Sequence, residues 1–293
     1  MTTPHEMIRT ATRARLLLHA EGLEAIVRFL ESQSHPDGGF RGRTPASDLY
    51  YTVFGLSCLI ALDRPLPTAP TARFLAAATR CKLDFVHSAS AARCQMLLSA
   101  PDAAACALPF LQRIETFRSD DGGYHHLVAH AATGTVYGAF LASLTYLEAG
   151  APIPRQEMLL SVLETSRTPD GGFANAADVA QSTATATSAA ILQKKWLSDN
   201  CNDAAAIAAL QHCTSPTGGF LAFAGAPAPD LLSTATSLYA LRSAGIQLET
   251  SLHEGFIESL WHDNGGFCGH AADHQPDVEY TFYALLALGC CTG

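Results

Sequence analysis

The sequence predicts an all-α fold, a toroid in which six helical hairpins form an inner and an outer ring of helices. Two observations support this prediction. A glycine pair followed by an aromatic residue recurs along the chain, and apolar residues at helical spacing lie on both sides of it. The five copies of the motif occupy residues 37–40, 121–124, 170–173, 217–220 and 264–267.

The spacing of the motif gives the number of units. The last four glycine pairs begin at positions 122, 171, 218 and 265, so they are 49, 47 and 47 residues apart. The first interval, from 38 to 122, is 84 residues and hides one degenerate unit. A fixed period of this length indicates a supersecondary unit that buries its apolar face by stacking on copies of itself. The chain therefore contains six units.

Each unit is predicted to be a helical hairpin. The first glycine pair follows Ile26, Phe29 and Leu30, whose spacing matches one face of a helix. Glycine permits the left-handed turn that ends a helix, and the aromatic residue after it can pack back on that helix.

The second helix of each unit begins with a shared pattern, an Asp followed four residues later by a Thr. It occupies 48–52, 230–234 and 277–281, and we place 131–135 and 181–185 in the same register. Asp is a favoured N-cap, because it accepts hydrogen bonds from the free N–H groups of the first turn. Small residues follow, as in 185–190 and 234–237, and they suit a crowded inner ring.

An even number of helices can close into a ring, and we expect one toroidal domain over residues 1–293. The predicted helices span 8–33, 47–63, 68–80, 88–100, 103–118, 131–148, 154–167, 180–196, 202–213, 230–244, 249–261 and 277–290.

Composition excludes several classes of function. The net charge is −9 and the chain has no basic stripe, which argues against a nucleic-acid partner. No apolar run is long enough for a transmembrane segment, and the N-terminal residues lack the apolar core of a signal peptide. Nine cysteines without a CxxC pair are typical of reduced thiols, so we expect a cytoplasmic protein.

Residues 29–40 followed by 48–52 resemble the repeat of the prenyltransferase β-subunit and squalene-terpene cyclase superfamily, the α/α toroid. The resemblance extends over essentially the whole chain. It implies a toroid fold, but this superfamily includes zinc prenyltransferases, class II terpene cyclases and non-catalytic relatives. Fold alone therefore does not identify the chemistry.

The resemblance to zinc prenyltransferases fails at the metal ligands. The Asp and Cys ligands of those enzymes correspond here to Asp230 and Leu232, and their His ligand corresponds to Tyr280. Leucine cannot bind zinc and neutral tyrosine is a poor ligand. The diphosphate-binding stretches, 175–180 and 221–229, contain no basic residue. We predict no cofactor and disfavour zinc, and a partner subunit remains an open question.

The class II cyclase motif, DxDD, is also absent. Among the remaining carboxylates, we expect Asp277 to be an N-cap and Glu279 to face the mouth of a central cavity inside the inner ring of helices. Glu279 is the best candidate acid, with Tyr280 and Asp230 nearby in the ring and His130 as a second base.

Further residues are candidates for substrate binding, and they lie at or near the starts of inner helices. Tyrosine rings there can stabilise a carbocation through their faces. Loop imidazole and carboxylate groups near the last motif are weak candidates for a metal site, because no further helix supplies a ligand. The substrate-binding candidates are Asp48, Tyr51, His126, Gln181 and Tyr283, and the weak metal candidates are His270, Asp273 and His274.

The function that these observations favour is a divergent terpenoid cyclase- or prenyltransferase-like enzyme. It would act by acid/base chemistry on an apolar, isoprenoid or polyene-like small molecule in the central cavity. Two alternatives remain open: a non-catalytic toroid that binds a ligand or a protein, and a zinc-dependent prenyltransferase with altered ligands.

Overall fold

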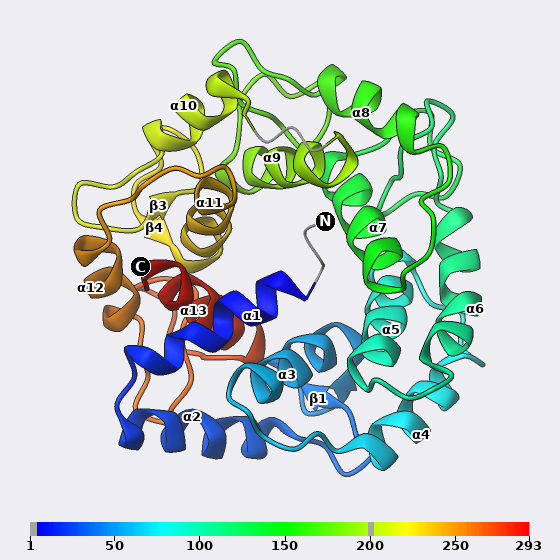
Figure 1. Ribbon diagram of the computed structural model, residues 1–293, viewed down its shortest axis with the longest axis vertical. Coiled ribbons are helices and arrows are strands. Elements are labelled where there is room, and N and C mark those ends of the chain that lie inside the picture. The colour runs from blue at the N-terminus through cyan, green and yellow to red at the C-terminus, as the bar shows by residue number, and fades with distance from the viewer. Residues whose placement is uncertain (1–4, 199–201, 293) are drawn as a thin grey trace.

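The computed structural model describes residues 5–198 and 202–292 and shows a closed ring of helices (Figure 1). An inner ring is surrounded by an outer ring, as the sequence predicts. The inner helices are α3 (Leu49–Ala61), α5 (Phe85–Leu97), α7 (Val136–Glu148), α9 (Ala184–Ser198), α11 (Leu231–Ser243) and α13 (Val278–Cys291). The outer helices are α2 (Ala20–Gln33), α4 (Thr68–Ala78), α6 (Ala103–Glu115), α8 (Gln156–Thr165), α10 (Ala204–His212) and α12 (Ser251–Ser259).

The ring closes where the last unit meets the first. Helix α13 packs against both α11 and α3. The turn of the last motif packs on α2, since a Cβ atom added to Gly265 would lie 2.1 Å from the carbonyl oxygen of Ala25. The unit without a glycine pair is the hairpin of α4 and α5, where the sequence predicts it.

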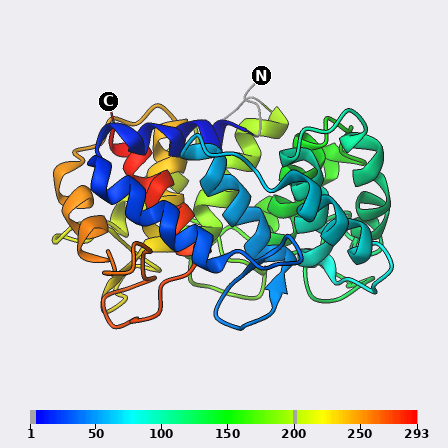
Figure 2. The same cartoon turned by 90° about the horizontal axis from the view of Figure 1, so that it is seen from below.

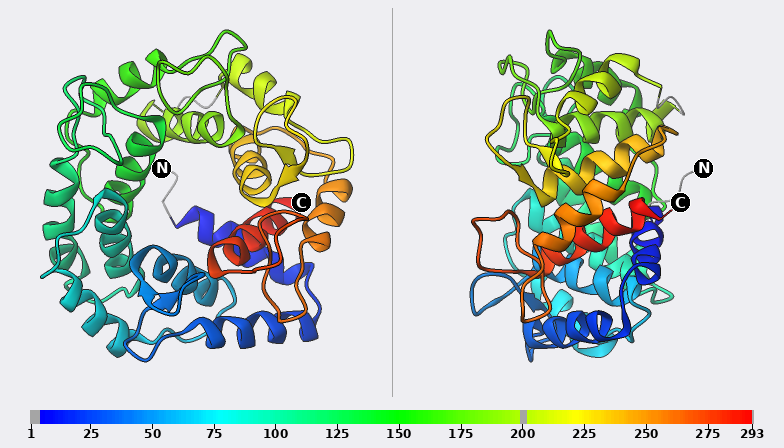
Figure 3. Two further views of the ribbon diagram at one scale, coloured as in Figure 1. Left: turned by 180° about the vertical axis from the view of Figure 1, so that it is seen from behind. Right: turned by 90° about the vertical axis from the view of Figure 1, so that its left-hand side faces the viewer.

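The prediction of one helix over 8–33 is wrong. The chain forms α1 (Glu6–Thr12), a 3-10 turn η1 (Arg13–Leu16) and then α2. Helix α1 lies across one end of the ring, while the long loops between outer and inner helices gather at the other end (Figures 2 and 3). A Cβ atom at Gly289 would lie 1.9 Å from the carbonyl oxygen of Thr10. This close packing of α1 on α13 buries Ile8 and Ala11, and it offsets the break in the helix.

The glycine pairs are the joints between units. The first glycine of every pair has a φ between +88° and +101°, which other residues rarely adopt. A Cβ atom there would overlap the outer helix of the next unit, for example at Pro70 beside Gly38 and at Leu252 beside Gly218. The aromatic residue of each motif is at most 2% exposed. The motif therefore recurs because each unit packs on its neighbour through the same contact.

The threonine of the inner-helix pattern also has a structural role. Its hydroxyl accepts the N–H of the motif aromatic, as Thr52 does for Phe40 at 2.9 Å and Thr234 does for Phe220 at 2.8 Å. In the α9 unit Thr187 accepts this bond, so the register predicted for 181–185 is wrong by two residues.

The register predicted for 131–135 is wrong as well. Thr135 is the N-cap of α7 and accepts the N–H of Gly138. The residue four positions after this cap, where Thr52 and Thr234 lie in their units, is Ala139, which has no hydroxyl to accept the N–H of the motif aromatic. The neighbouring Gly138 lies close to that aromatic residue, since a Cβ atom there would be 2.3 Å from the carbonyl oxygen of Tyr124.

Short antiparallel ribbons, which the sequence analysis did not predict, brace two of the loops. Strand β1 (Phe40–Arg41) pairs with β2 (Ser47–Asp48), and β3 (Phe220–Leu221) pairs with β4 (Pro229–Asp230). The cysteines within the described residues are free thiols. No helix in this part of the chain combines the length and the apolar character needed to cross a bilayer.

Candidate functional site in the central cavity

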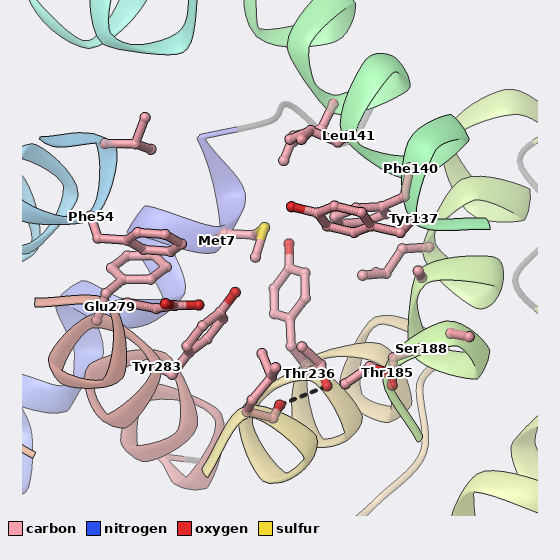
Figure 4. Close-up of a pocket in the computed structure, with 18 of the residues that line it drawn as sticks. Met7, Phe54, Tyr137, Phe140, Leu141, Thr185, Ser188, Thr236, Glu279 and Tyr283 are labelled. Atoms are coloured by element: carbon pink, nitrogen blue, oxygen red, sulfur yellow. Dashed lines mark hydrogen bonds between the residues drawn. The ribbon is translucent and has the colours of Figure 1, made fainter. Parts of the chain in front are cut away.

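A cavity of about 480 Å³ lies at the centre of the ring (Figure 4). Every inner helix contributes to its wall, and Met7 of α1 lines it as well. The lining residues are Met7, Tyr50, Val53, Phe54, Ser90, Arg93, Tyr137, Phe140, Leu141, Leu144, Asn175, Thr183, Thr185, Ala186, Ser188, Ala189, Leu192, Leu232, Thr236, Tyr239, Glu279, Phe282 and Tyr283. The wall is therefore mostly apolar and aromatic.

Glu279 is the carboxylic acid of this cavity. It lies in the first turn of α13, and burial raises its pKa to about 7. The Tyr50 hydroxyl donates a hydrogen bond of 2.5 Å to Glu279 Oε1, which opposes that shift. The charge of Asp277 raises the pKa further, and that of Arg43 lowers it. At neutral pH the group is thus available both as an acid and as a base.

Two tyrosines place hydroxyl groups in the cavity. Figure 4 shows the hydroxyls of Tyr137 and Tyr283 pointing toward its middle. Burial and the nearby Glu279 charge raise the pKa of Tyr137 to about 12 and that of Tyr283 well above its ordinary value. Both hydroxyls therefore remain protonated hydrogen-bond donors at physiological pH.

The cavity also contains a buried ion pair. Arg93 of α5 binds Glu148 of α7 through two bonds, Nε to Oε2 at 2.7 Å and Nη2 to Oε1 at 3.2 Å. The side chains are 15% and 3% exposed. Burial alone would lower the pKa of Arg93, but the Glu148 carboxylate holds it above its usual value. Such a bidentate pair fixes the orientation of the guanidinium plane.

Asp277 is an N-cap, as predicted. It accepts the N–H of Tyr280 at 2.9 Å and binds Arg43 Nε at 2.9 Å. Arg43 also binds Asp273 at 2.6 Å, and its guanidinium lies 5.6 Å from the Tyr280 ring centroid. Burial raises the pKa of Asp277 even though Arg43 opposes the shift. Tyr280 thus lies beside Arg43 and Asp277, and it is not among the residues that line the cavity.

Three other candidate site residues lie at or near the starts of inner helices, where two of them are N-caps. Asp48 caps α3 and binds His87 Nε2 at 2.9 Å. The bond from His87 lowers the pKa of Asp48 although burial opposes it, and Asp48 raises the pKa of His87 to about 9. Asp230 caps α11 by accepting the N–H of Ser233, and Tyr51 packs on Gly42. None of these predicted residues lines the cavity.

The remaining predictions divide between the wall and the outer surface. Tyr283 lines the cavity, together with Glu279. His126 is not among the lining residues, but its ring lies edge-on to that of Tyr137 at 5.1 Å and its Nδ1 is bonded to the Thr135 hydroxyl at 3.0 Å. His130 and Gln181 are exposed and do not contribute to the cavity.

The candidate metal residues do not converge. His270 and His274 are exposed, and the Asp273 carboxylate is held by Arg43 and by the N–H groups of Gly269 and Gln275. The described part of the chain has no group of three His, Cys, Asp or Glu side chains that could hold a metal ion. At the superfamily's zinc position, Leu232 presents only hydrocarbon to the cavity. The side chains at these positions therefore do not form a zinc site.

Most residues of the cavity wall were not predicted from the sequence. Arg93 belongs to the degenerate unit, where no motif fixes the register. A single arginine among the small residues of 88–94 was the available signal. Tyr137 and Phe140 lie three residues apart, a spacing that places them on one face of α7. Thr185 lines the cavity because the true register of α9 rotates it inward.

Comparisons with known proteins agree with this architecture. The chain superposes on a variant of the type II terpene cyclase MstE from Scytonema, in complex with geranylgeranyl dihydroxybenzoate. The TM-score is 0.62 at 11% identity, over 98% of this chain and 97% of that chain. A protein from Actinoplanes gives 0.62 at 16% identity over 94% and 99%, and a wild-type glycosidase gives 0.59 at 13% over 99% of each chain. Likeness at such identities shows the fold alone.

Family membership follows from the sequence itself. The comparison with curated proteins finds no match. The family model for the prenyltransferase alpha-alpha toroid domain matches residues 12–90, 91–228 and 183–292, which together span nearly all of the chain. The chain therefore belongs to the prenyltransferase alpha-alpha toroid family.

Proposed function

We propose that this protein is a terpenoid cyclase- or prenyltransferase-like enzyme that performs acid/base chemistry on an apolar isoprenoid or polyene-like substrate. The observation that supports this most is Glu279, a carboxyl group with a pKa near 7 in a mostly apolar and aromatic cavity. Perturbed carboxyl groups in clefts are candidates for catalysis. The volume of about 480 Å³ is within the range of small-molecule sites.

The acid would act from the wall of the cavity. With Oε1 of Glu279 accepting the Tyr50 hydroxyl, the proton of the neutral acid belongs on Oε2. A carbon–carbon π pair of the substrate takes this proton and becomes a C–H bond, which leaves a cationic carbon on the substrate and the O–H bonding pair on Glu279 as a carboxylate. A second π pair of the substrate then forms a carbon–carbon bond to the cationic carbon and closes a ring of the product. Loss of a proton from carbon to the carboxylate or to water forms a double bond and ends the reaction. No oxidant or reductant is consumed.

The aromatic wall suits such a cation. The faces of Tyr and Phe rings attract positive charge, and Phe54, Tyr137, Phe140 and Tyr283 all border the cavity (Figure 4). The lining contains one cationic side chain, Arg93, and Glu148 neutralises it. A diphosphate would therefore find no free cluster of cations, which favours a substrate without one.

The first experiment identifies the ligand. The purified, tag-free chain is analysed by native mass spectrometry and then extracted with organic solvent. The Scytonema toroid, solved with geranylgeranyl dihydroxybenzoate, makes isoprenoids the first compounds for a turnover screen. A co-purified isoprenoid or a converted compound supports the proposal. An empty chain that converts nothing in the screen favours an interaction toroid instead.

The second experiment tests the acid with the compound found. We expect Glu279→Gln to lower turnover by about 10²- to 10⁴-fold while ligand affinity stays within a factor of a few. Glu31→Gln, at an exposed position of α2, is the matched control and should keep full activity. Unchanged turnover in the Glu279→Gln variant would remove Glu279 from the mechanism.

A further inference from the structure

We infer that the cavity recognises a neutral oxygen atom of its substrate through Arg93, Tyr137 and Tyr283. The substrate class is then an oxygenated isoprenoid, an alcohol, epoxide, ketone or aldehyde, and neither a hydrocarbon nor an anion. The inference rests on the proposed function in one respect, because it takes the cavity as an isoprenoid site. It does not depend on Glu279 being the catalytic acid.

The first support is the unused edge of Arg93. Its Nε and Nη2 atoms both bind Glu148, which fixes the guanidinium plane. Its third nitrogen, Nη1, donates to no protein acceptor within residues 5–198 and 202–292, and Arg93 lines the cavity. A guanidinium held rigidly on one edge presents preorganised N–H donors on the other.

The second support is the charge balance at this place. Arg93 and Glu148 form a pair with no net charge, and both side chains are largely buried. An anionic group at Nη1 would add a buried negative charge that no second cation compensates. A neutral acceptor needs no compensation, because it takes a hydrogen bond without changing the charge.

The third support comes from the two tyrosine hydroxyls. The Tyr137 and Tyr283 hydroxyls point toward the middle of the cavity (Figure 4). Neither has a hydrogen-bond acceptor among the protein groups of the described residues, in contrast to Tyr50, which donates to Glu279. Arg93 lines the same cavity as these two tyrosines, so all three side chains border one ligand-sized space.

A hydrocarbon would be a poor occupant of this region. It would displace water from the Arg93 and tyrosine donors without replacing the lost hydrogen bonds, which reduces affinity. An oxygen atom with two lone pairs can accept from two of the three donors at once. The rest of the wall is apolar enough to hold the isoprenoid chain.

The test is a binding series that requires no turnover. Isothermal titration calorimetry compares five probes of equal chain length: farnesane, farnesol, farnesal, farnesoic acid and farnesyl diphosphate. We expect farnesol or farnesal to bind about tenfold or more tightly than farnesane and than both anions. Equal affinity for farnesane, tightest binding of an anion, or no binding of any probe would each overturn the inference.

A paired variant assigns the preference to Arg93. Arg93→Met combined with Glu148→Gln removes both charges together, so no buried charge is left without its counter-ion. We expect it to bind farnesane within about twofold of the wild type and to lose the preference for farnesol. A second variant, Tyr137→Phe, preserves the ring and should reduce the preference partially. If both variants retain the full preference, the inference is wrong.

The outcome is distinguishable from that of the proposed function. A chain that prefers farnesol, yet turns over no compound, would leave the oxygen site standing and remove the enzyme. Turnover that depends on Glu279, with farnesane bound as tightly as farnesol, would keep the enzyme and remove the oxygen site.

Discussion

The two sides of the cavity wall differ in chemistry. Helices α3, α5, α7 and α13 contribute large rings and the charged groups, among them Phe54, Arg93, Tyr137 and Glu279. Helices α9 and α11 contribute mainly small side chains, and Tyr239 is their aromatic member. The small lining residues of these helices are Thr185, Ala186, Ser188, Ala189 and Thr236. The side formed by α9 and α11 leaves space for a ligand. The side formed by α3, α5, α7 and α13 provides the carboxylic acid, the hydrogen-bond donors and the aromatic ring faces.

This difference separates two properties that are often merged. Affinity for an apolar ligand depends on the space that small residues leave and on the apolar area that the ligand buries there. Catalysis depends on polar groups whose pKa values and orientations are set by burial. Substitutions on the two sides should therefore change different measurements.

The largest effect is expected on the aromatic and charged side. Arg93→Ala leaves the Glu148 carboxylate buried without its counter-ion, which should lower the free energy of unfolding by about 3–5 kcal/mol. Arg93→Met with Glu148→Gln should recover most of that loss. Urea denaturation of the three proteins measures it. A single variant as stable as the wild type would show that solvent reaches the pair.

The next effect is the pH dependence of stability from Glu279. Its pKa is about 7 in the folded chain and near 4.5 when unfolded, so the folded state holds more protons between these values. Glu279 therefore contributes stability that is lost as pH rises from about 4.5 to about 7, amounting to about 3 kcal/mol.

The matched measurement compares the wild type with Glu279→Gln at pH 5 and pH 7.5. Other titrating groups cancel in the difference, so the variant should gain stability relative to the wild type at the higher pH. Turnover that uses Glu279 as an acid should likewise decline above about pH 7. A constant difference between the two proteins would mean that the Glu279 pKa is not raised.

A smaller effect, on ligand affinity, is expected from a substitution on the side formed by α9 and α11. Ala189→Leu places three more carbons in the cavity and should weaken ligand binding by about tenfold, which is about 1.4 kcal/mol. Stability should change by less than about 0.5 kcal/mol, because the added atoms enter open space. Ala208→Leu, exposed on α10, is the control for hydrophobic gain. Normal affinity in Ala189→Leu would place the ligand elsewhere.

The smallest effect is expected at Tyr50. Tyr50→Phe removes the hydrogen bond that lowers the pKa of Glu279, so the pKa should rise further. The descending limb of the pH–rate profile should then move to higher pH, with a stability loss of about 1 kcal/mol. A shift toward lower pH would contradict the assigned direction of this bond.

The sequence alone predicted much of this architecture. It predicted the number of units, the hidden unit at α4 and α5, and the N-caps at Asp48, Asp230 and Asp277. These features depend on local rules, because glycine at positive φ and capping by Asp involve neighbours in the chain. Two of the residues singled out from the sequence, Glu279 and Tyr283, line the cavity, and their place in the chain follows from the start of α13.

Tertiary structure alone decided the rest. The break after α1 depends on packing across the ring on α13, far along the chain. The sequence pattern predicted that Thr185 takes the position whose hydroxyl bonds the motif aromatic. In the structure the N–H of Phe173 donates to Thr187, two residues later. The pairing of Arg93 with Glu148 and of Tyr50 with Glu279 joins separate repeats. Repetition along the chain encodes the ring, but burial and charge pairing arise only where the closed ring brings distant residues together, and they determine the chemistry of the cavity.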